Sequence, residues 1–200
     1  MVRLETYKPE QYSGLSPGPG SIHGFRSDAI ALKIWRSKVG IIPQEIHIFK
    51  GTSLQNLISD ISESKIKEVV SVISLFGLNG FVESFPSGLM TLVGEEGINL
   101  SGGQKQLIAF MRDLIKKPEI LIIDEGTSGM DRNTESIVMN LITRLKSEMG
   151  VLLISHRINI IRNLSDYIYV IENGSIRDKG SHEELMRSDN LYRRYWDDFY

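Results

Sequence analysis

The stretch of sequence that decides the fold reads LSGGQ at residues 100–104 and LIIDE at residues 121–125. The first motif opens a predicted helix over residues 101–117, where two glycines let backbone approach a ligand and free N–H groups face an anion. The second is a continuous apolar run, typical of a parallel strand covered on both faces, and it ends in two carboxylates. Because ligands bind beyond the carboxyl ends of strands in open α/β sheets, this order predicts a site for an anionic ligand.

The two carboxylates, Asp124 and Glu125, suit different tasks. Asp124 suits Mg²⁺, since hard cations prefer oxygen ligands, and Glu125 suits a general base or a polariser of attacking water. The alternative is that both acids only cap the next turn, just as Ser101 could be a plain helix N-cap. With the glycine motif and the acidic pair in this order, we favour the functional interpretation.

Two further predicted strand ends carry polar side chains. His156 follows an apolar strand at residues 151–154 and could donate a hydrogen bond to a phosphate or to water. Gln44 follows a strand at residues 39–43 and could reach Mg²⁺ or water. Alone, such a histidine would be structural and such a glutamine a surface residue. We predict that Asp124, His156 and Gln44 converge at one edge of the sheet, whereas Ser101 sits apart and faces a partner.

The remaining elements alternate between strands and helices. Helical spacing predicts apolar stripes at Ile66, Val69, Val70, Ile73, Leu75 and Phe76, at Leu107, Met111, Leu114 and Ile115, and at Ile137, Val138, Leu141, Ile142 and Leu145. The first of these helices has Gly77 as its C-cap and the third has Asp131 as its N-cap. Asn173-Gly174 predicts a two-residue hairpin between strands at 167–172 and 175–179. A capping box at residues 181–184 opens a final helix that docks through Leu185, Tyr192, Tyr195 and Trp196. This alternation indicates an α/β sheet closed by a small hairpin.

The composition is that of an ordinary globular domain. The 200 residues are 41% hydrophobic and 24% charged with a net charge of -2, so no basic excess points to nucleic acid. Cysteine is absent, which excludes disulfides, thiolate catalysis and cysteine-based metal sites and fits a cytoplasmic protein. No apolar run approaches the roughly 18 residues of a membrane-spanning helix, and the start does not resemble a signal peptide.

Residues 1–27 differ from the rest, because three of the six prolines and four glycines fall there. Residues 16–21 read SPGPGS, which predicts a loop or linker with no periodicity able to bury a face. We therefore expect residues 1–27 to be an irregular segment outside the fold, and residues 28–200 to form the domain.

Five ordered motifs over about residues 32–200 resemble the nucleotide-binding domain of ABC transporters. They are Gln44 as the Q-loop, residues 100–104 as the signature, Asp124 and Glu125 as the Walker B pair, residues 128–131 as the D-loop, and His156 as the switch histidine. Residues 91–97 resemble the X-loop of exporters, which touches the transmembrane domain, and peptide or bacteriocin exporters are the most similar subgroup. Gly126 and Gly129 stand where the family usually has alanine, which loosens the backbone.

The resemblance implies an α/β fold like that of P-loop NTPases: a parallel sheet core, a helical subdomain at about residues 50–117, and a missing N-terminal part. Two such domains sandwich two ATP molecules head to tail with Mg²⁺. The family roles carry over as Asp124 and Gln44 for the metal, Glu125, His156 and Gln44 for catalysis, and Ser101, Gly102, Gly103, Gln104 and Asp131 for contacts to ATP. The implied partners are a second nucleotide-binding domain and an exporter's transmembrane domain, at the cytoplasmic face of the plasma (inner) membrane.

One family motif has no counterpart in the sequence. A Walker A loop needs G-x-x-x-x-G-K-[ST], yet none of the 18 glycines is followed by lysine. Residues 14–21 read GLSPGPGS and resemble the Walker A pattern only weakly. Two prolines remove amide donors, and no strand is predicted before these residues. We expect the loop to belong near or before Met1, so that autonomous ATP turnover by this chain is doubtful.

Three explanations stay open: an incomplete exporter ATPase domain, a degenerate partner subunit that does not hydrolyse ATP, or a structural-maintenance ATPase head. Intact Glu125 and His156 argue against the second, and the absence of coiled-coil heptads argues against the third. In the family the helix after the Walker A loop packs in the middle of the sheet. Its absence predicts an open groove over strands 121–123 and 151–154 and a marginal fold, unless residues 1–38 supply a substitute. The best candidates in that segment are Ala29, Ile30, Leu32, Ile34 and Trp35.

Overall fold

The computed structural model describes residues 2–6, 21–22, 25–26, 32–95, 97–126 and 130–199. The chain divides into two compact units. Unit 1 consists of Met1–Gly40, Pro118–Ile122 and Met149–Tyr200, and unit 2 consists of Ile41–Lys117 and Ile123–Glu148. The boundary crosses two strands, β4 (Val39–Ile42) and β7 (Ile120–Asp124). Two short strands, β2 (Ser21–Ile22) and β3 (Phe25–Arg26), pair with each other.

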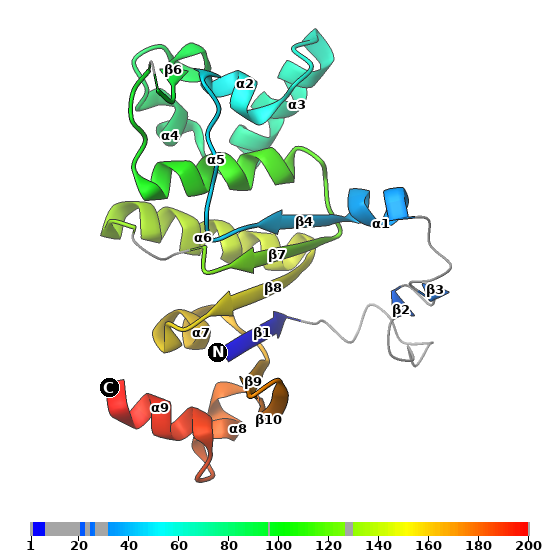
Figure 1. The fold of residues 1–200 in the computed structure, drawn as a ribbon, viewed down its shortest axis with the longest axis vertical. Coiled ribbons are helices and arrows are strands. Elements are labelled where there is room, and N and C mark those ends of the chain that lie inside the picture. Colours follow the sequence, from blue (N-terminus) through cyan, green and yellow to red (C-terminus); the bar gives the residue numbers. More distant parts are fainter. Residues whose placement is uncertain are drawn as a thin grey trace. The chain divides into compact units, whose positions relative to one another are not determined.

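A six-stranded sheet has the order β10-β9-β1-β8-β7-β4 (Figure 1). Its other strands are β1 (Val2–Thr6), β8 (Gly150–Ser155), β9 (Ile168–Glu172) and β10 (Ser175–Gly180). The predicted strands at 39–43, 121–123 and 151–154 are thus confirmed. The α/β class is confirmed as well, since helices separate these strands along the chain.

Strand β1 lies inside the sheet and runs antiparallel to both of its neighbours. Val2 pairs with Ser155 of β8 on one side and with Val170 of β9 on the other. The prediction that no strand precedes residues 14–21 is therefore wrong. The short alternation in VRLET was too weak a signal next to the Pro/Gly-rich sequence that follows it.

The central strands are covered mainly on one face. Leu121 and Ile123 of β7 are fully buried, whereas Ile120 and Ile122, which point to the opposite face, are half-buried. In β8, Val151 and Leu153 are buried and Leu152 is half-buried. Backbone pairing with β1 protects an edge of β8 and covers neither face of it. The half-buried Ile120, Ile122 and Leu152 agree with the predicted groove over these strands, which stays a prediction.

Helices dominate unit 2. They are α2 (Ser53–Leu57), α3 (Glu63–Leu75), α4 (Asn79–Glu83), a 3₁₀ turn at Gly88–Met90, α5 (Gly102–Leu114) and α6 (Arg132–Glu148). Short strands β5 (Gly51–Thr52) and β6 (Leu92–Val93) pair with each other. The stripes predicted for α5 and α6 are confirmed, since their members lie buried or half-buried, and α5 lies beside α6 (Figure 1). In α3 the stripe is partly wrong, because Val70 and Leu75 are exposed.

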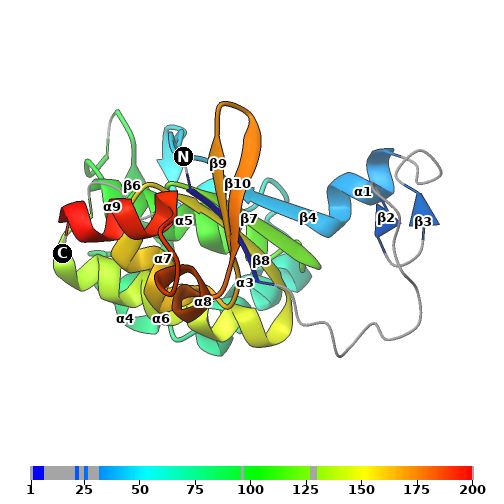
Figure 2. The ribbon, with the colours of Figure 1, turned by 90° about the horizontal axis from the view of Figure 1, so that it is seen from below.

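Unit 1 contains the predicted hairpin. Asn173 and Gly174 have φ values of 49° and 75°, the left-handed pair that a two-residue turn between β9 and β10 requires. Helices α1 (Leu32–Lys38), α7 (Ile158–Leu164), α8 (His182–Met186) and α9 (Leu191–Phe199) complete the unit (Figure 2). The predicted final helix is thus two helices, and only the first begins with the capping box of Ser181 and Glu184.

None of the helices in the described ranges is both long and apolar enough to cross a membrane.

Candidate functional site

The side-chain amide of Gln44 contacts the carboxylate of Glu125. Gln44 lies shortly after β4, Glu125 lies directly after β7, and both belong to unit 2. The Nε2 atom of Gln44 donates a hydrogen bond to Oε2 of Glu125 at 2.9 Å. This contact joins side chains 81 positions apart in the sequence, at the ends of two strands. The predicted convergence of Asp124, Gln44 and His156 stays a prediction.

The backbone at Glu125 is unusual for a residue with a side chain. Its φ of 51° lies in the left-handed region, which costs a residue other than glycine about 1–3 kcal/mol. The next residue, Gly126, is buried, and a Cβ atom there would lie 2.5 Å from Cγ2 of Ile123. The chain therefore turns sharply away from β7 and leaves the Glu125 carboxylate beside Gln44. Glycine at position 126 makes room for Ile123 in addition to loosening the backbone.

Asp124 is the last residue of β7 and is half-buried. Among the described residues, no three histidine, aspartate or glutamate side chains lie close enough together to hold a metal ion. Mg²⁺ in nucleotide sites commonly takes only one or two carboxylates and fills its other positions with water and phosphate oxygens. Asp124 and the amide oxygen of Gln44 are the oxygen donors at the ends of β7 and β4, so they fit the protein share of such a site.

His156 directly follows β8 and is exposed. It belongs to unit 1, whereas Gln44 and Glu125 belong to unit 2. The convergence of His156 with these two residues therefore stays a prediction.

Ser101 begins helix α5 as part of a capping box. Its Oγ atom accepts a hydrogen bond from the backbone N–H of Gln104 at 3.2 Å, and Oε1 of Gln104 accepts one from the N–H of Ser101 at 2.9 Å. The plain N-cap alternative thus describes one real role of Ser101. A hydroxyl that accepts from the backbone keeps its own O–H free to donate, so this capping role leaves Ser101 able to bind an anion. The residue is exposed, as binding from outside requires.

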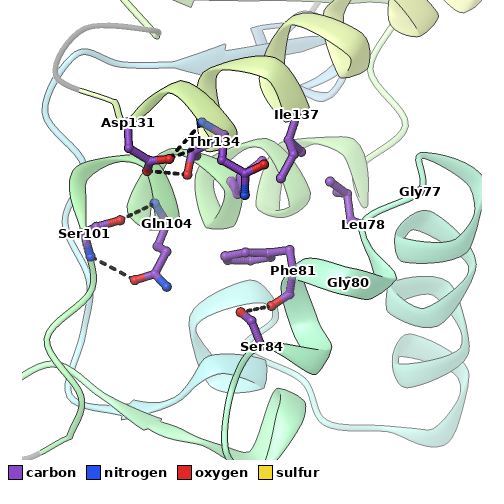
Figure 3. Close-up of a pocket in the computed structure, with 12 residues that line it drawn as sticks. Gly77, Leu78, Gly80, Phe81, Ser84, Ser101, Gln104, Asp131, Thr134 and Ile137 are labelled. Atoms are coloured by element: carbon purple, nitrogen blue, oxygen red, sulfur yellow. Dashed lines mark hydrogen bonds between the residues drawn. The ribbon is translucent and has the colours of Figure 1, made fainter.

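A cavity of about 520 Å³ opens between α4 and the first turns of α5 and α6 in unit 2 (Figure 3). Ser101, Gln104, Asp131 and Thr134 supply its polar wall. Its apolar wall comes from Leu78, Phe81, Leu107 and Ile137. The residues at the ends of β4 and β7 are not part of this lining, so two separate polar sites lie within unit 2.

Asp131 caps helix α6, as predicted. Its Oδ1 atom accepts hydrogen bonds from the N–H groups of Asn133 and Thr134, each at 3.0 Å, and Oδ2 accepts one from the Thr134 hydroxyl at 2.7 Å. These bonds, led by the one from the Thr134 hydroxyl, hold the pKa of Asp131 below its usual range. Its carboxylate is therefore charged and already used as an acceptor. Ser128 and Gly129 of the predicted D-loop lie outside the described residues.

Gly102 and Gly103 have different surroundings. Gly102 is exposed, whereas Gly103 is buried and faces helix α6. A Cβ atom at Gly103 would lie 2.4 Å from Cγ2 of Thr134, so α5 can approach α6 only with glycine at this position. Sequence reasoning assigned both glycines to ligand approach. The packing role of Gly103 requires the position of Thr134, which no local sequence pattern contains.

The order of these elements and polar groups agrees with the comparison with known families. The sequence profile described as ABC transporter matches residues 12–128, more than half of the chain. The chain belongs to the ABC transporter family. The match begins inside the segment of residues 1–27, which sequence reasoning set apart from the domain.

Individual ABC transporters agree with this assignment. The chain is 37% identical over 183 residues to ABC transporter B family member 4 of Dictyostelium discoideum, which covers 92% of this chain and 24% of that protein. It is 35% identical over 187 residues to a multidrug resistance ABC transporter ATP-binding and permease protein of Lactococcus lactis, covering 93% of this chain and 32% of that protein. A solved structure of a bacterial Atm1-family ABC exporter with ATP bound aligns with a TM-score of 0.75 and 32% identity, over 88% of this chain and 31% of that one.

The chain thus spans about a quarter to a third of the length of these ABC transporters. Its resemblance to an ABC ATPase domain with an α/β fold, inferred from five motifs, is confirmed. The roles of individual site residues stay predictions.

Proposed function

We propose that this chain is the ATP-binding part of an ABC exporter and uses ATP with Mg²⁺ to drive association with a second nucleotide-binding domain. The observation that carries the proposal is the hydrogen bond between Gln44 and Glu125 at the ends of β4 and β7. It joins the amide that we assign to the metal and the carboxylate that we assign as the base, and Asp124 is the residue directly before Glu125. The left-handed backbone of Glu125 supports the same conclusion, since such strain gathers at functional sites.

In the proposed site, Asp124 and the Gln44 amide oxygen would hold Mg²⁺. Glu125 accepts a proton from the attacking water, and the amide of Gln44 orients its carboxylate. His156 donates a hydrogen bond to the terminal phosphate. The bound Mg²⁺ would neutralise charge that develops on the phosphate oxygens.

Ser101 and its neighbours serve the ATP of the partner domain in this proposal. Ser101 donates its O–H, and the N–H groups of Gly102 and Gly103 at the start of α5 face the phosphate. The cavity beside Ser101 is unsuited to a phosphate, because part of its wall is apolar and the Asp131 carboxylate is negatively charged and already hydrogen-bonded. Gln104 and Asp131 therefore contribute by holding the first turns of α5 and α6 in place.

The absence of any Gly-Lys pair in the 200 residues favours a second candidate function. Without a Walker A lysine and its amides, most contacts to the phosphates of the chain's own ATP are missing. The chain would then complete the site of a partner domain and leave its own site unable to turn over. We expect this chain alone to hydrolyse ATP slowly or undetectably. Robust turnover that disappears in Glu125→Gln would overturn that expectation.

The proposed membrane partner is the transmembrane domain of the exporter, at the cytoplasmic face of the plasma (inner) membrane. Phe49, Met90 and Leu92 are each more than half exposed, and such large apolar side chains on one unit favour contact with another protein. They lie next to or within the predicted X-loop at residues 91–97. Export of a peptide stays a prediction from the resemblance.

The proposal that Ser101 completes the ATP site of a partner domain can be tested with a restored chain. In the restored chain, residues 1–27 are replaced by a strand, a Walker A loop and a helix of the family type. With Glu125→Gln to block hydrolysis, ATP and Mg²⁺ should convert the restored chain from monomer to dimer in light scattering after size exclusion. Adding Ser101→Arg should abolish the dimer, whereas Ser181→Ala, which removes the corresponding cap in unit 1, should not. A dimer that forms equally well with Ser101→Arg would contradict the proposal.

A further inference from the structure

The guanidinium group of Arg112, near the end of helix α5, is held by groups from a different segment of unit 2. Its Nε atom donates a hydrogen bond to the backbone carbonyl of Asn56 at 2.8 Å. Its two Nη atoms reach the carbonyl of His47 at 3.5 and 3.4 Å. The guanidinium carbon also lies 5.8 Å from the centre of the Phe49 ring, within the range of a cation–π contact. One cation therefore ties α5 to three residues between positions 47 and 56.

That segment is folded back on itself by the side chain of Asn56. Its Oδ1 atom accepts a hydrogen bond from the N–H of Phe49 at 2.8 Å, and its Nδ2 atom donates to the carbonyls of Phe49 at 2.9 Å and Thr52 at 3.1 Å. Asn56 is only 3% exposed, so losing these bonds would leave buried polar groups unsatisfied. The same residue thus links Phe49 and Thr52 through its side chain and Arg112 through its backbone carbonyl.

The same piece carries an exposed apolar surface. Phe49 is 66% exposed even though its ring contacts Arg112. Gly51 of β5 pairs with Val93 of β6, and the N–H of Ser53 donates to the carbonyl of Thr91 at 2.8 Å. Residues 91–93 thus share a backbone hydrogen-bond network with residues 51–53. A force on Phe49 or on the neighbouring loop would act directly on the segment that Arg112 holds.

We propose that Arg112 is a positioning residue that couples the surface around Phe49 to the first turn of helix α5. This inference rests on the proposed function, in which Ser101 binds a partner's ATP and the Phe49 surface meets the transmembrane domain. Arg112 and Ser101 stand eleven positions apart, so about 16 Å of helix separates them at 1.5 Å per residue. An α-helix moves over this length nearly as a rigid rod. Displacing the segment at Phe49 therefore shifts α5 and reorients the N–H groups that follow Ser101.

The geometry requires arginine in particular. Its planar fork reaches two carbonyls and the face of a ring together, whereas the ammonium of lysine is a compact point charge on a flexible stem. Arg112→Lys should keep the positive charge and most of the packing while loosening the connection. It is therefore the variant that separates coupling from simple charge or bulk.

The test uses the whole chain, without nucleotide or partner, and amide NMR shifts as the measurement. Phe49→Ala should shift the amides of residues 101–104 in the chain with Arg112. In the Arg112→Lys background, Phe49→Ala should shift the amides of residues 101–104 by about half as much or less, as expected when a coupling free energy is reduced. Arg132→Gln, a change of an exposed arginine in the same unit, is the matched control and should leave the response intact.

Two outcomes would overturn the inference. One is that Phe49→Ala leaves the amides of residues 101–104 unmoved in the chain with Arg112, a result that needs no arginine variant. The other is an equal response with Arg112 and with lysine at that position. Should Arg112→Lys fail to fold, Asn56→Ser breaks the same connection from its other side and must also weaken the response. The NMR test contains no ATP, so a negative result in it says nothing about ATP-driven dimer formation. A negative dimer test likewise leaves the NMR result valid.

Discussion

Removing the hydroxyl of Ser101 should lower stability and block function by two separable routes. In the structure Ser101 and Gln104 form a reciprocal capping box with hydrogen bonds of 3.2 and 2.9 Å. Ser181 and Glu184 form a second box with the same two distances in the other unit. The chain thus contains an internal control with the same geometry and no proposed contact to nucleotide.

Replacing an N-cap serine by alanine typically costs about 0.5–2 kcal/mol of stability. Because Ser101 is exposed, water can satisfy part of the freed N–H of Gln104, so we expect about 1 kcal/mol for Ser101→Ala. For a chain of this length, 1 kcal/mol corresponds to about 2–4 °C in Tm. Ser181→Ala should cost a similar amount, since its bond lengths are the same. Ser101→Gly should cost only about a few tenths of a kcal/mol, because glycine is itself a good N-cap.

The assay is thermal unfolding followed by circular dichroism, combined with the ATP-dependent dimer measurement on the restored chain. Ser101→Gly is the decisive variant, since it removes the hydroxyl with little loss of stability. We expect it to weaken the dimer as strongly as Ser101→Ala does, while Ser181→Ala leaves the dimer intact. Equal loss of dimer in both alanine variants and none in Ser101→Gly would refute the reasoning, because stability alone would then explain the effect.

Three further predictions concern other residues. Gly126→Ala should destabilise the chain by about 1–3 kcal/mol in a denaturant melt, because the new methyl group would meet Ile123 at 2.5 Å; an unchanged midpoint would contradict this packing. In the restored chain, Glu125→Gln should keep ATP binding but lower the hydrolysis rate by about 10²–10⁴, and unchanged turnover would assign the base role elsewhere. Burial and then the nearby Arg162 lower the pKa of His182, so the folded state binds fewer protons than the unfolded one as pH falls below about 6.5. The free energy of unfolding should therefore decrease from pH 7 to pH 5, and His182→Phe should flatten that slope.

Sequence patterns were sufficient for elements whose signal is local. Three elements could be predicted because the residues that stabilise them are close together in the sequence, and the structure contains all three. They are strand β7, helix α5 and the turn at Asn173-Gly174. The capping box of Ser181 and Glu184 was likewise legible from residue types at fixed offsets.

Features that depend on residues far apart in the sequence could not be predicted. Strand β1 is stabilised by pairing with β8 and β9, so its five residues carry almost no signal of their own. The burial of Gly103 depends on Thr134 in the next helix, and the contact of Arg112 with Asn56 joins residues 56 positions apart. For the candidate site, the sequence predicted that Gln44 and Asp124 belong to one edge. The hydrogen bond of Gln44 to Glu125 and the left-handed backbone of Glu125 required coordinates.

The register of β1 also determines when this sheet can form during synthesis. Val2 leaves the ribosome before its partners Ser155 and Val170, which are 153 and 168 positions later. At about 5–20 residues per second, β1 waits for roughly 8–30 s before β8 exists. During that time its backbone N–H and C=O groups are open to any other extended chain, including a neighbouring nascent copy. A sheet whose interior strand is made long before both of its neighbours is therefore exposed to misassembly while the chain is still on the ribosome.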